Sequence, residues 1–327
     1  MKTSLSWQPI GNRICECAFY FFYALLRLLP ASVFRTIARP FLQAFIRVAI
    51  PRQRVMKNLS GAFGQSYTWA TKKGLAKGVQ LHFIENLLDC LTQLADPQYA
   101  KKLIAIRGMQ HLDTALQKGK GVLALGAHIG NFVLLGTRLG LEGHRVHTLF
   151  RIPPDRRIGR LIAKFLPHYH QVVIPSLPRR AAVTRILDTL RRNEIVYVLG
   201  DNLKKGKINA LFFGQQVPSP RGPVSLALRS GAPLVPLYLI RNYDGNMELV
   251  IEPEIPIKRK GHLGADISDS TKEVLSFLES LIRRYPDQWN WLTVRLHAYR
   301  RIVNPNDAIG ANILREEEIL EVERWSG

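Results

Sequence analysis

The fold is decided by the stretch Gly121-Val-Leu-Ala-Leu-Gly-Ala-His-Ile-Gly-Asn-Phe-Val-Leu-Leu-Gly136. It begins as an apolar run typical of a buried strand, passes through small residues, and continues after Asn131 as an apolar segment of helical character. Asn131 suits the N-cap of that helix, and Gly126 and Gly130 permit tight turns. Because chemistry in α/β sheets is usually found where a strand ends before a helix, His128 is a candidate for a functional site. For an isolated histidine, however, the local pattern favours a structural role in which it bonds to the backbone of its own turn.

Strand-like and helical runs alternate on both sides of this stretch. We expect strands at 121–126, 145–150, 171–175, 195–200, 210–213, 233–240 and 247–251. Helical periodicity predicts helices at 68–94, 132–140, 156–166, 179–193, 223–230 and 270–285. This alternation predicts an α/β fold with a mixed, mainly parallel sheet flanked by helices.

The N-terminal segment, residues 1–50, is apolar and punctuated by arginines. Residues 17–26 are uncharged and rich in aromatic side chains, but they are shorter than the about 20 apolar residues that a spanning helix needs. Arginines then recur among apolar residues at 27, 35, 39 and 47, a basic amphipathic pattern that suits an anionic lipid surface. We therefore expect a helical membrane anchor, and a helix that lies on the membrane is favoured over one that spans it. The alternative is a buried helix with a solvated basic edge.

No repeat or long linker divides the rest of the chain. Residues 51–300 are expected to form one α/β domain, and residues 301–327 a polar acidic tail. The formal net charge of +21 implies an anionic partner: nucleic acid, an anionic membrane, or an acidic protein or substrate. The apolar N-terminal segment and the absence of any nucleic-acid motif favour lipid, so no nucleic acid is expected.

Several common catalytic and cofactor-binding motifs are missing from the sequence. It has no G-x-S-x-G nucleophile turn, no P-loop, no H-E-x-x-H zinc motif and no dinucleotide fingerprint. Its three cysteines are too few and too poorly spaced for a disulfide framework or a zinc site. We expect a reducing, cytoplasmic-side location and neither a metal nor a cofactor.

Five segments carry a family resemblance, in order along most of the chain. One of them, His128-Ile-Gly-Asn-Phe-Val133, resembles the motif H-x-G-N-W-[ED]. The other four are Arg52-Gln-Arg-Val-Met-Lys-Asn-Leu59; Val198-Leu-Gly-Asp-Asn202; Phe212-Phe-Gly214 with Gly222-Pro223 and Arg229-Ser-Gly-Ala-Pro-Leu-Val-Pro236; and Tyr285-Pro-Asp-Gln-Trp-Asn-Trp291 with Arg295. They are similar to motifs of the late acyltransferases of lipid A biosynthesis, the lauroyl and myristoyl transferases of the lysophospholipid acyltransferase superfamily.

The resemblance implies a glycerolipid acyltransferase-like fold and a reaction. Members transfer a fatty acyl chain from acyl carrier protein (or CoA) to a hydroxyl of a membrane lipid, here a lipid A precursor, at the cytoplasmic face of the bacterial inner membrane. His128 matches the general base of the family, and Asn131 would hold the corner. A lysophospholipid or another glycolipid is the alternative acceptor.

Val133 departs from the family pattern, which places Glu or Asp there to orient the histidine. Disabling the comparable aspartate of serine proteases costs roughly 10⁴ in rate. Asp201 ends another predicted strand and is the candidate to replace this carboxylate, the alternative being a loop cap. Three outcomes stay open: an active enzyme with a substituted partner, a slow enzyme, or a lipid-binding homologue without activity.

Basic residues near predicted strand ends are candidates for binding phosphates of the acceptor or an acidic acyl carrier protein. For each of them the alternative is a solvated surface charge. They are Arg151, Arg157, Arg160, Lys204, Lys205 and Arg221.

Overall fold

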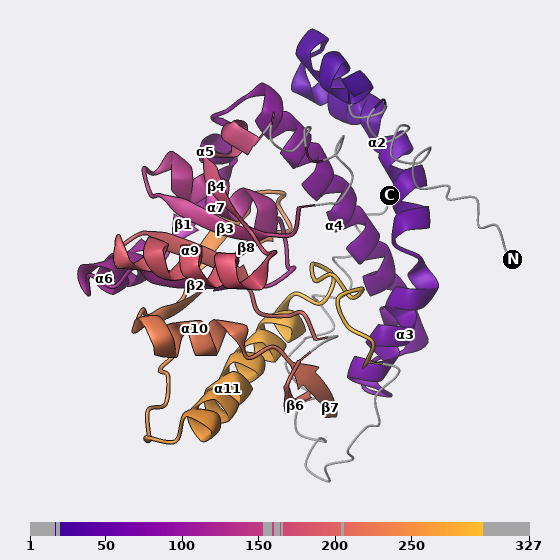
Figure 1. Ribbon diagram of the computed structural model, residues 1–327. Coiled ribbons are helices and arrows are strands. Elements are labelled where there is room, and N and C mark those ends of the chain that lie inside the picture. Colours follow the sequence, from indigo (N-terminus) through magenta and orange to yellow (C-terminus); the bar gives the residue numbers. More distant parts are fainter. Residues whose placement is uncertain are drawn as a thin grey trace, which may run out of the picture.

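The computed structural model describes residues 17, 20–152, 159, 164, 166–203 and 206–296. Its centre is a seven-stranded sheet of order β1-β9-β8-β2-β5-β3-β4 (Figure 1). Five neighbouring strands are parallel: β8 (Leu234–Arg241), β2 (Val122–Gly126), β5 (Ile195–Leu199), β3 (Val146–Phe150) and β4 (Gln171–Pro175). The strand β9 (Met247–Ile251) runs antiparallel to β8, and the edge strand β1 (Ile104–Arg107) is parallel to β9. The prediction of a mixed, mainly parallel sheet is confirmed.

The predicted strands are all present, and their ends differ from prediction by at most two residues. One of them, β6 (Ile208–Phe212), lies outside the central sheet, where it pairs with β7 (Gln215–Ser219) in a separate hairpin. The sequence did not predict β1 or β7. The strand β1 has only four residues, and β7 is polar and contains Pro218, so neither shows the apolar pattern of a strand.

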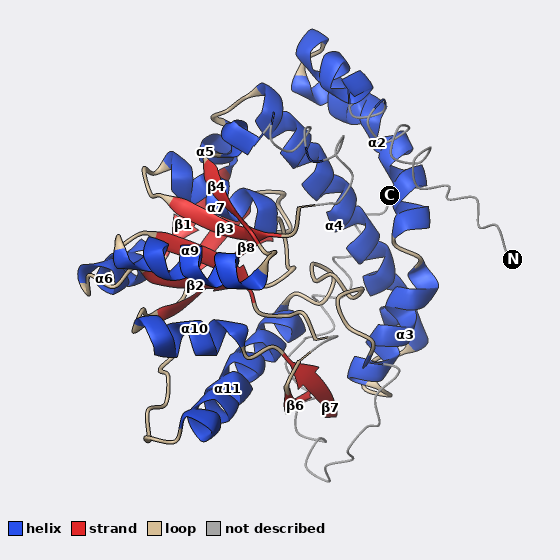
Figure 2. Ribbon diagram, viewed as in Figure 1, coloured by secondary structure: helices blue, strands red, loops and turns tan. Residues whose placement is uncertain are grey.

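Helices cover both faces of the sheet (Figure 2). One face carries α5 (Tyr99–Leu103), α6 (Met109–Gln117) and α7 (Phe132–Leu141); the other carries α9 (Arg179–Arg191) and α10 (Gly222–Ser230), with α11 (Leu263–Arg284) packed beside α10. The predicted start of α11 at residue 270 was wrong, because its first turn has an exposed Leu263 and polar neighbours that hide the helical pattern. The helix predicted at 156–166 lies mostly outside the described residues.

A further group of helices stands beside the carboxyl ends of the parallel strands (Figure 1). It comprises α2 (Ala31–Ala49), α3 (Arg52–Phe63) and α4 (Trp69–Ala95), with α2 and α3 both packed on α4. α2 buries Phe34, Ala38, Leu42 and Ile46, which recur every four residues and join the main core. Within the described part of the chain, we find no helix with the length and apolar character that a membrane crossing needs.

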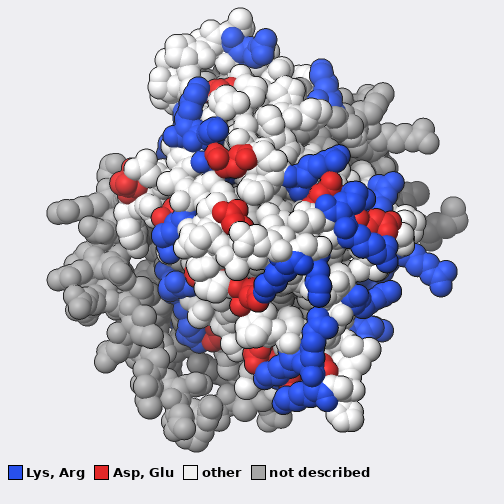
Figure 3. Space-filling view, turned by 90° about the vertical axis from the view of Figure 1, so that its left-hand side faces the viewer, with Lys and Arg blue, Asp and Glu red and all other residues white. Residues whose placement is uncertain are grey.

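Acidic and basic residues are mixed on one side of the molecule (Figure 3), whereas the segment 17–84 is basic. Figure 3 views the side opposite α2–α4, where Lys and Arg side chains gather with Asp and Glu between them. Several are paired at the beginnings of strands: Arg145 Nη1 lies 3.2 Å from Glu194 Oε1, and Arg192 Nη2 lies 3.0 Å from Glu194 Oε2. By contrast, residues 17–84 include ten Lys or Arg residues and no Asp or Glu.

Candidate active site

The carboxyl end of β2 leads into a tight turn, residues 126–131. Gly130 has φ +53°, and a Cβ at this position would lie 1.6 Å from the carbonyl oxygen of Leu239. Only glycine fits so close to a neighbouring strand with this backbone conformation. The turn therefore lies directly against β8 and brings His128 to the carboxyl edge of the sheet.

His128 and Asp201 meet because their strands are neighbours. In the parallel pair β2–β5, Gly126 lies opposite Leu199, and each polar residue follows two positions later. His128 Nδ1 lies 2.8 Å from Asp201 Oδ1, and the His128 backbone N–H donates to Asp201 Oδ2 at 2.8 Å. The Asp201 side chain is fully buried, whereas the His128 side chain is 26% exposed. Only the histidine of this pair is open to solvent.

The charge state of Asp201 follows from its partners. Burial alone would raise the pKa of the carboxyl, but the positive charge that His128 can carry and hydrogen bonds from His128 and Trp289 outweigh it, and the pKa lies below its ordinary value. An ionised carboxylate only accepts, so Nδ1 of His128 carries the proton. Nε2 is then the nitrogen that can take a proton from a reacting group.

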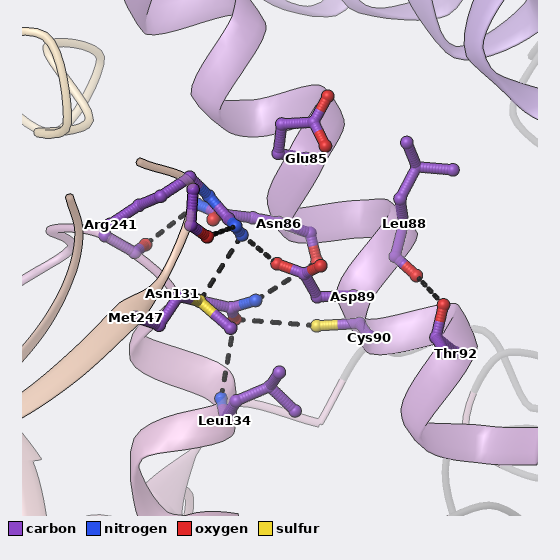
Figure 4. Close-up of polar contacts among 12 residues, drawn as sticks. Glu85, Asn86, Leu88, Asp89, Cys90, Thr92, Asn131, Leu134, Arg241 and Met247 are labelled. Atoms are coloured by element: carbon purple, nitrogen blue, oxygen red, sulfur yellow. Dashed lines mark hydrogen bonds and ion pairs between the residues drawn. The ribbon is translucent and has the colours of Figure 1, made fainter. Parts of the chain in front are cut away.

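Asn131 stabilises the turn between β2 and α7. Its Oδ1 accepts from the Leu134 N–H at 3.4 Å, which makes it the N-cap of α7, and it also accepts from Cys90 Sγ at 3.6 Å. Its Nδ2 donates to the carbonyl of Asn86 at 3.3 Å, while Asn86 Nδ2 donates to the carbonyl of Gly130 at 2.9 Å (Figure 4). Helix α4 and the turn are thus fastened to each other by both side-chain amides.

Val133 lies in the first turn of α7 and is 40% exposed. Its backbone carbonyl accepts from Gln171 Nε2 at 2.9 Å. The histidine thus has a carboxylate partner, Asp201, without any acidic side chain at position 133.

Of the basic residues predicted to bind substrate, the structure describes two. Arg151 is exposed directly after β3, and Arg221 is exposed at the start of α10. Arg157, Arg160, Lys204 and Lys205 lie outside the described residues. Phosphate binding by this group stays a prediction. No cluster of three or more His, Cys, Asp or Glu side chains suited to a metal ion occurs in the described ranges.

A segment after α11 completes the site, and no local pattern of residues indicates its position. Residues 288–290 lie antiparallel to 128–130, with a bridge between Ile129 and Trp289. The Gly130 N–H donates to the Gln288 carbonyl at 3.0 Å, and the Asn290 N–H donates to the His128 carbonyl at 2.9 Å. Trp289 Nε1 donates to Asp201 Oδ2 at 2.8 Å. The Gln-Trp motif is visible in the sequence, but a separation of some 160 residues predicts no contact with His128.

A second buried carboxylate, Asp89 of α4, lies one helical turn from Asn86 (Figure 4). Its Oδ1 accepts from Arg35 Nη1 and from the Tyr99 hydroxyl, both at 2.9 Å, and its Oδ2 accepts from Arg241 Nη2. Arg35 also binds Glu85, with Nη2 and Oε2 2.6 Å apart. This cluster ties α2 to α4 and to the end of β8.

Comparison with known proteins places these features in a family. A family model described as bacterial lipid A biosynthesis acyltransferase matches residues 12–298. A phosphatidylinositol mannoside acyltransferase of Mycobacterium tuberculosis (strain CDC 1551 / Oshkosh) is 29% identical over 140 residues, which are 41% of this chain and 43% of that protein. The corresponding protein of Mycolicibacterium smegmatis is 24% identical over 191 residues, 56% of this chain and 59% of that protein.

The lipid A biosynthesis palmitoleoyltransferase of Escherichia coli (strain K12) is 24% identical over 270 residues, 78% of this chain and 79% of that protein. The match to this protein extends over most of both chains. The chain spans less than two thirds of the length of each of the two mannoside acyltransferases.

Proposed function

This chain belongs to the bacterial lipid A biosynthesis acyltransferase family, and we propose that it transfers a fatty acyl group from a thioester to a hydroxyl of a glycolipid. The observation that carries the proposal is the contact of the signature histidine, His128, with the buried carboxylate of Asp201 at 2.8 Å. A partly exposed imidazole held by an ionised carboxylate is suited to general-base chemistry at neutral pH.

In the proposed reaction, His128 Nε2 takes the proton of the acceptor hydroxyl as that oxygen attacks the thioester carbonyl. The resulting tetrahedral intermediate breaks its carbon–sulfur bond and leaves the acyl group on the acceptor as an ester. The departing sulfur receives the proton from the His128 imidazolium, which restores the neutral base. Asp201 stabilises the imidazolium and keeps Nε2 directed toward the reacting groups.

We propose an active enzyme and not a lipid-binding homologue without activity. The concern raised by Val133 was the loss of the carboxylate that orients the base. Asp201 supplies a carboxylate at hydrogen-bond distance from His128 Nδ1, with no contribution from position 133. This arrangement supports catalysis by a substituted partner.

The relatives support a glycolipid acceptor, since two have phosphatidylinositol mannoside in their names and one has lipid A. We propose a lipid A precursor or a related phosphorylated glycolipid as acceptor and acyl carrier protein, or CoA, as acyl donor. Exposed basic residues such as Arg151 and Arg221 are suited to the phosphate groups of the acceptor or to an acidic carrier protein.

We also propose that the enzyme works from the cytoplasmic face of the inner membrane, lying on the bilayer by the outer face of α2. This face bears five exposed apolar side chains: Val33, Ile37, Phe41, Phe45 and Val48. The surrounding segment, 17–84, contains no acidic residue, and although Glu85 of α4 pairs with Arg35 and Arg39, the excess of basic residues in the segment suits anionic lipid headgroups.

Vesicle sedimentation tests this surface. Replacing Phe41 and Phe45 by serine should reduce binding to anionic vesicles severalfold, because two aromatic side chains no longer enter the bilayer interface. Leu211→Ser is the matched control, since Leu211 and Phe45 are both 54% exposed but Leu211 lies on β6. Equal binding by the double variant and the control would exclude α2 as the docking face.

The reaction is tested with radiolabelled acyl donors and a panel of acceptors. Purified protein is incubated with acyl carrier protein or CoA thioesters and with a lipid A precursor, a mannosylated phosphatidylinositol or a lysophospholipid. Acylation of one of the two glycolipids is expected. Acylation of the lysophospholipid alone would replace the proposed acceptor class, and no transfer to any acceptor would contradict an active enzyme.

A further inference from the structure

Trp289 belongs to a motif after α11 to which the proposed reaction assigns no role. We propose that Trp289 is a positioning residue of the His128–Asp201 pair, whose indole N–H fixes the rotation of the Asp201 carboxylate. The inference rests on the proposed function, because it concerns how the base of that reaction is oriented.

Among the described residues, the carboxylate of Asp201 has one donor on Oδ1 and two on Oδ2. Oδ1 accepts from His128 Nδ1, and Oδ2 accepts from the His128 backbone and from Trp289 Nε1, all at 2.8 Å. Rotation of a carboxylate about its Cβ–Cγ bond is otherwise broad and roughly two-fold. The other two donors belong to His128, which is the residue that must be oriented. Trp289 therefore holds the Asp201 carboxylate independently of His128.

The backbone around Trp289 accounts for its rigid placement. Its neighbours Gln288 and Asn290 pair with the turn at 128–130 through their backbone groups. The indole is fully buried, with the Phe212 ring 5.9 Å and the Trp291 ring 4.8 Å from it, centroid to centroid. The direction of its N–H is therefore set by packing and does not depend on substrate.

The chemistry of indole suits this role. Tryptophan only donates, so it favours the ionised carboxylate that His128 requires when it becomes an imidazolium. Within the described part of the chain, the titratable groups that interact with Asp201 are His128 and Tyr197, and burial raises the pKa of the Tyr197 hydroxyl far above its ordinary value. Of these two groups, the histidine is the side chain suited to gain and lose a proton near neutral pH.

Trp291 provides a matched control within the same motif. It is as deeply buried as Trp289, but its Nε1 donates to the carbonyl of Pro286 at 2.6 Å. Replacement of either tryptophan by phenylalanine removes the same volume and one hydrogen bond. Only the replacement at position 289 removes a hydrogen bond from Asp201.

We expect Trp289→Phe to lower kcat about tenfold, with KM near that of the unaltered protein, because it removes a hydrogen bond to the charged group that orients the base. The acid limb of the kcat profile should move to higher pH, since a carboxylate with one donor fewer attracts the His128 proton more strongly. Trp291→Phe should lower the melting temperature about as much as Trp289→Phe does, but it should leave the acid limb of the kcat profile in place. Identical pH profiles for the two variants would reduce Trp289 to a packing role.

A measurement on the unaltered protein separates this inference from the proposed function. In protein labelled with ¹⁵N-tryptophan, the Trp289 indole proton should resonate downfield, move strongly in Asp201→Asn and stay in place in Asp89→Asn. A Trp289 indole proton whose chemical shift is unchanged in Asp201→Asn would overturn the inference. This readout needs neither an acyl donor nor a foldable Trp289 variant, so a failure to transfer acyl groups would leave it intact.

Discussion

Asp89 and Asp201 are both fully buried carboxylates beside the turn at 128–131, but their partners differ. Asp89 binds two arginines and a tyrosine, whereas Asp201 binds a histidine and a tryptophan. Arginine keeps its charge at every accessible pH, so the two arginines that face Asp89 are permanent positive charges. Histidine can gain and lose a proton, and His128 is partly open to solvent.

Burial of a carboxylate does not by itself mark a catalytic residue. A buried charge between permanent opposite charges ties elements together, as Asp89 ties α2, α4 and β8. When the partner of a buried carboxylate is titratable and reaches solvent, the carboxylate stabilises the protonated form of that partner, as catalysis requires. We therefore expect substitutions of the two aspartates to affect different quantities.

The largest expected difference concerns turnover in Asp201→Asn. The amide keeps the shape of the side chain but removes the charge that stabilises the His128 imidazolium, and kcat should fall about 10³-fold. Steady-state kinetics with a thioester donor and a glycolipid acceptor measure this. A loss of less than fivefold would show that the pair is structural.

The same variant has a stability signature with a known sign. The pKa of Asp201 is lowered in the folded protein, so its ionisation contributes stability that is present at neutral pH and is lost as the pH falls through the lowered pKa. Chemical denaturation should therefore find Asp201→Asn less stable than the unaltered protein at pH 7. This difference should shrink at pH values below the ordinary carboxyl range.

Asp89→Asn should act on stability and spare turnover. Removal of this charge leaves Arg241 and Arg35 without their shared counter-ion, and the free energy of unfolding should decrease by about 3 kcal/mol. Urea denaturation measures the change. At a temperature where the variant is folded, its kcat should stay within about threefold of the unaltered protein, a difference of less than 1 kcal/mol. A larger loss of kcat with little loss of stability would remove the distinction between the two aspartates.

Val133→Glu should have the smallest effect. Position 133 is 40% exposed and His128 already has a carboxylate partner. An exposed ion pair contributes up to about 1 kcal/mol, so kcat should change less than about fivefold. Val133→Gln is the control for side-chain length. A large gain with glutamate and none with glutamine would mean that the site works poorly without the family's acidic residue.

Much of the fold could be predicted from the sequence because buried parallel strands leave continuous apolar runs. β2 and β5 are examples, as is the helical spacing of α4. Short or polar elements such as β1, β7 and the first turn of α11 escape this reasoning, because their hydrogen bonds and not their apolar pattern define them. The membrane-facing role of residues 1–50 stays a proposal that the exposed face of α2 supports.

The site was predictable only in part. His128 and Asn131 lie together at one strand end, where the local pattern indicates a corner. Asp201 could be put forward only as a candidate, since the neighbour relation of β2 and β5 is a property of sheet order. Trp289 and the Asp89 cluster are joined to the site by contacts between distant segments, and nothing in local sequence specifies such contacts.

The turnover of His128→Ala tests most sharply whether His128 is the base of acyl transfer. His82→Ala is its matched control, because His82 also pairs with a carboxylate, Asp287, at 3.2 Å, and is 19% exposed. We predict that His128→Ala loses about 10⁴-fold in kcat when it is assayed at a temperature where it is folded, and that His82→Ala keeps its activity. Undiminished transfer by His128→Ala would contradict the account.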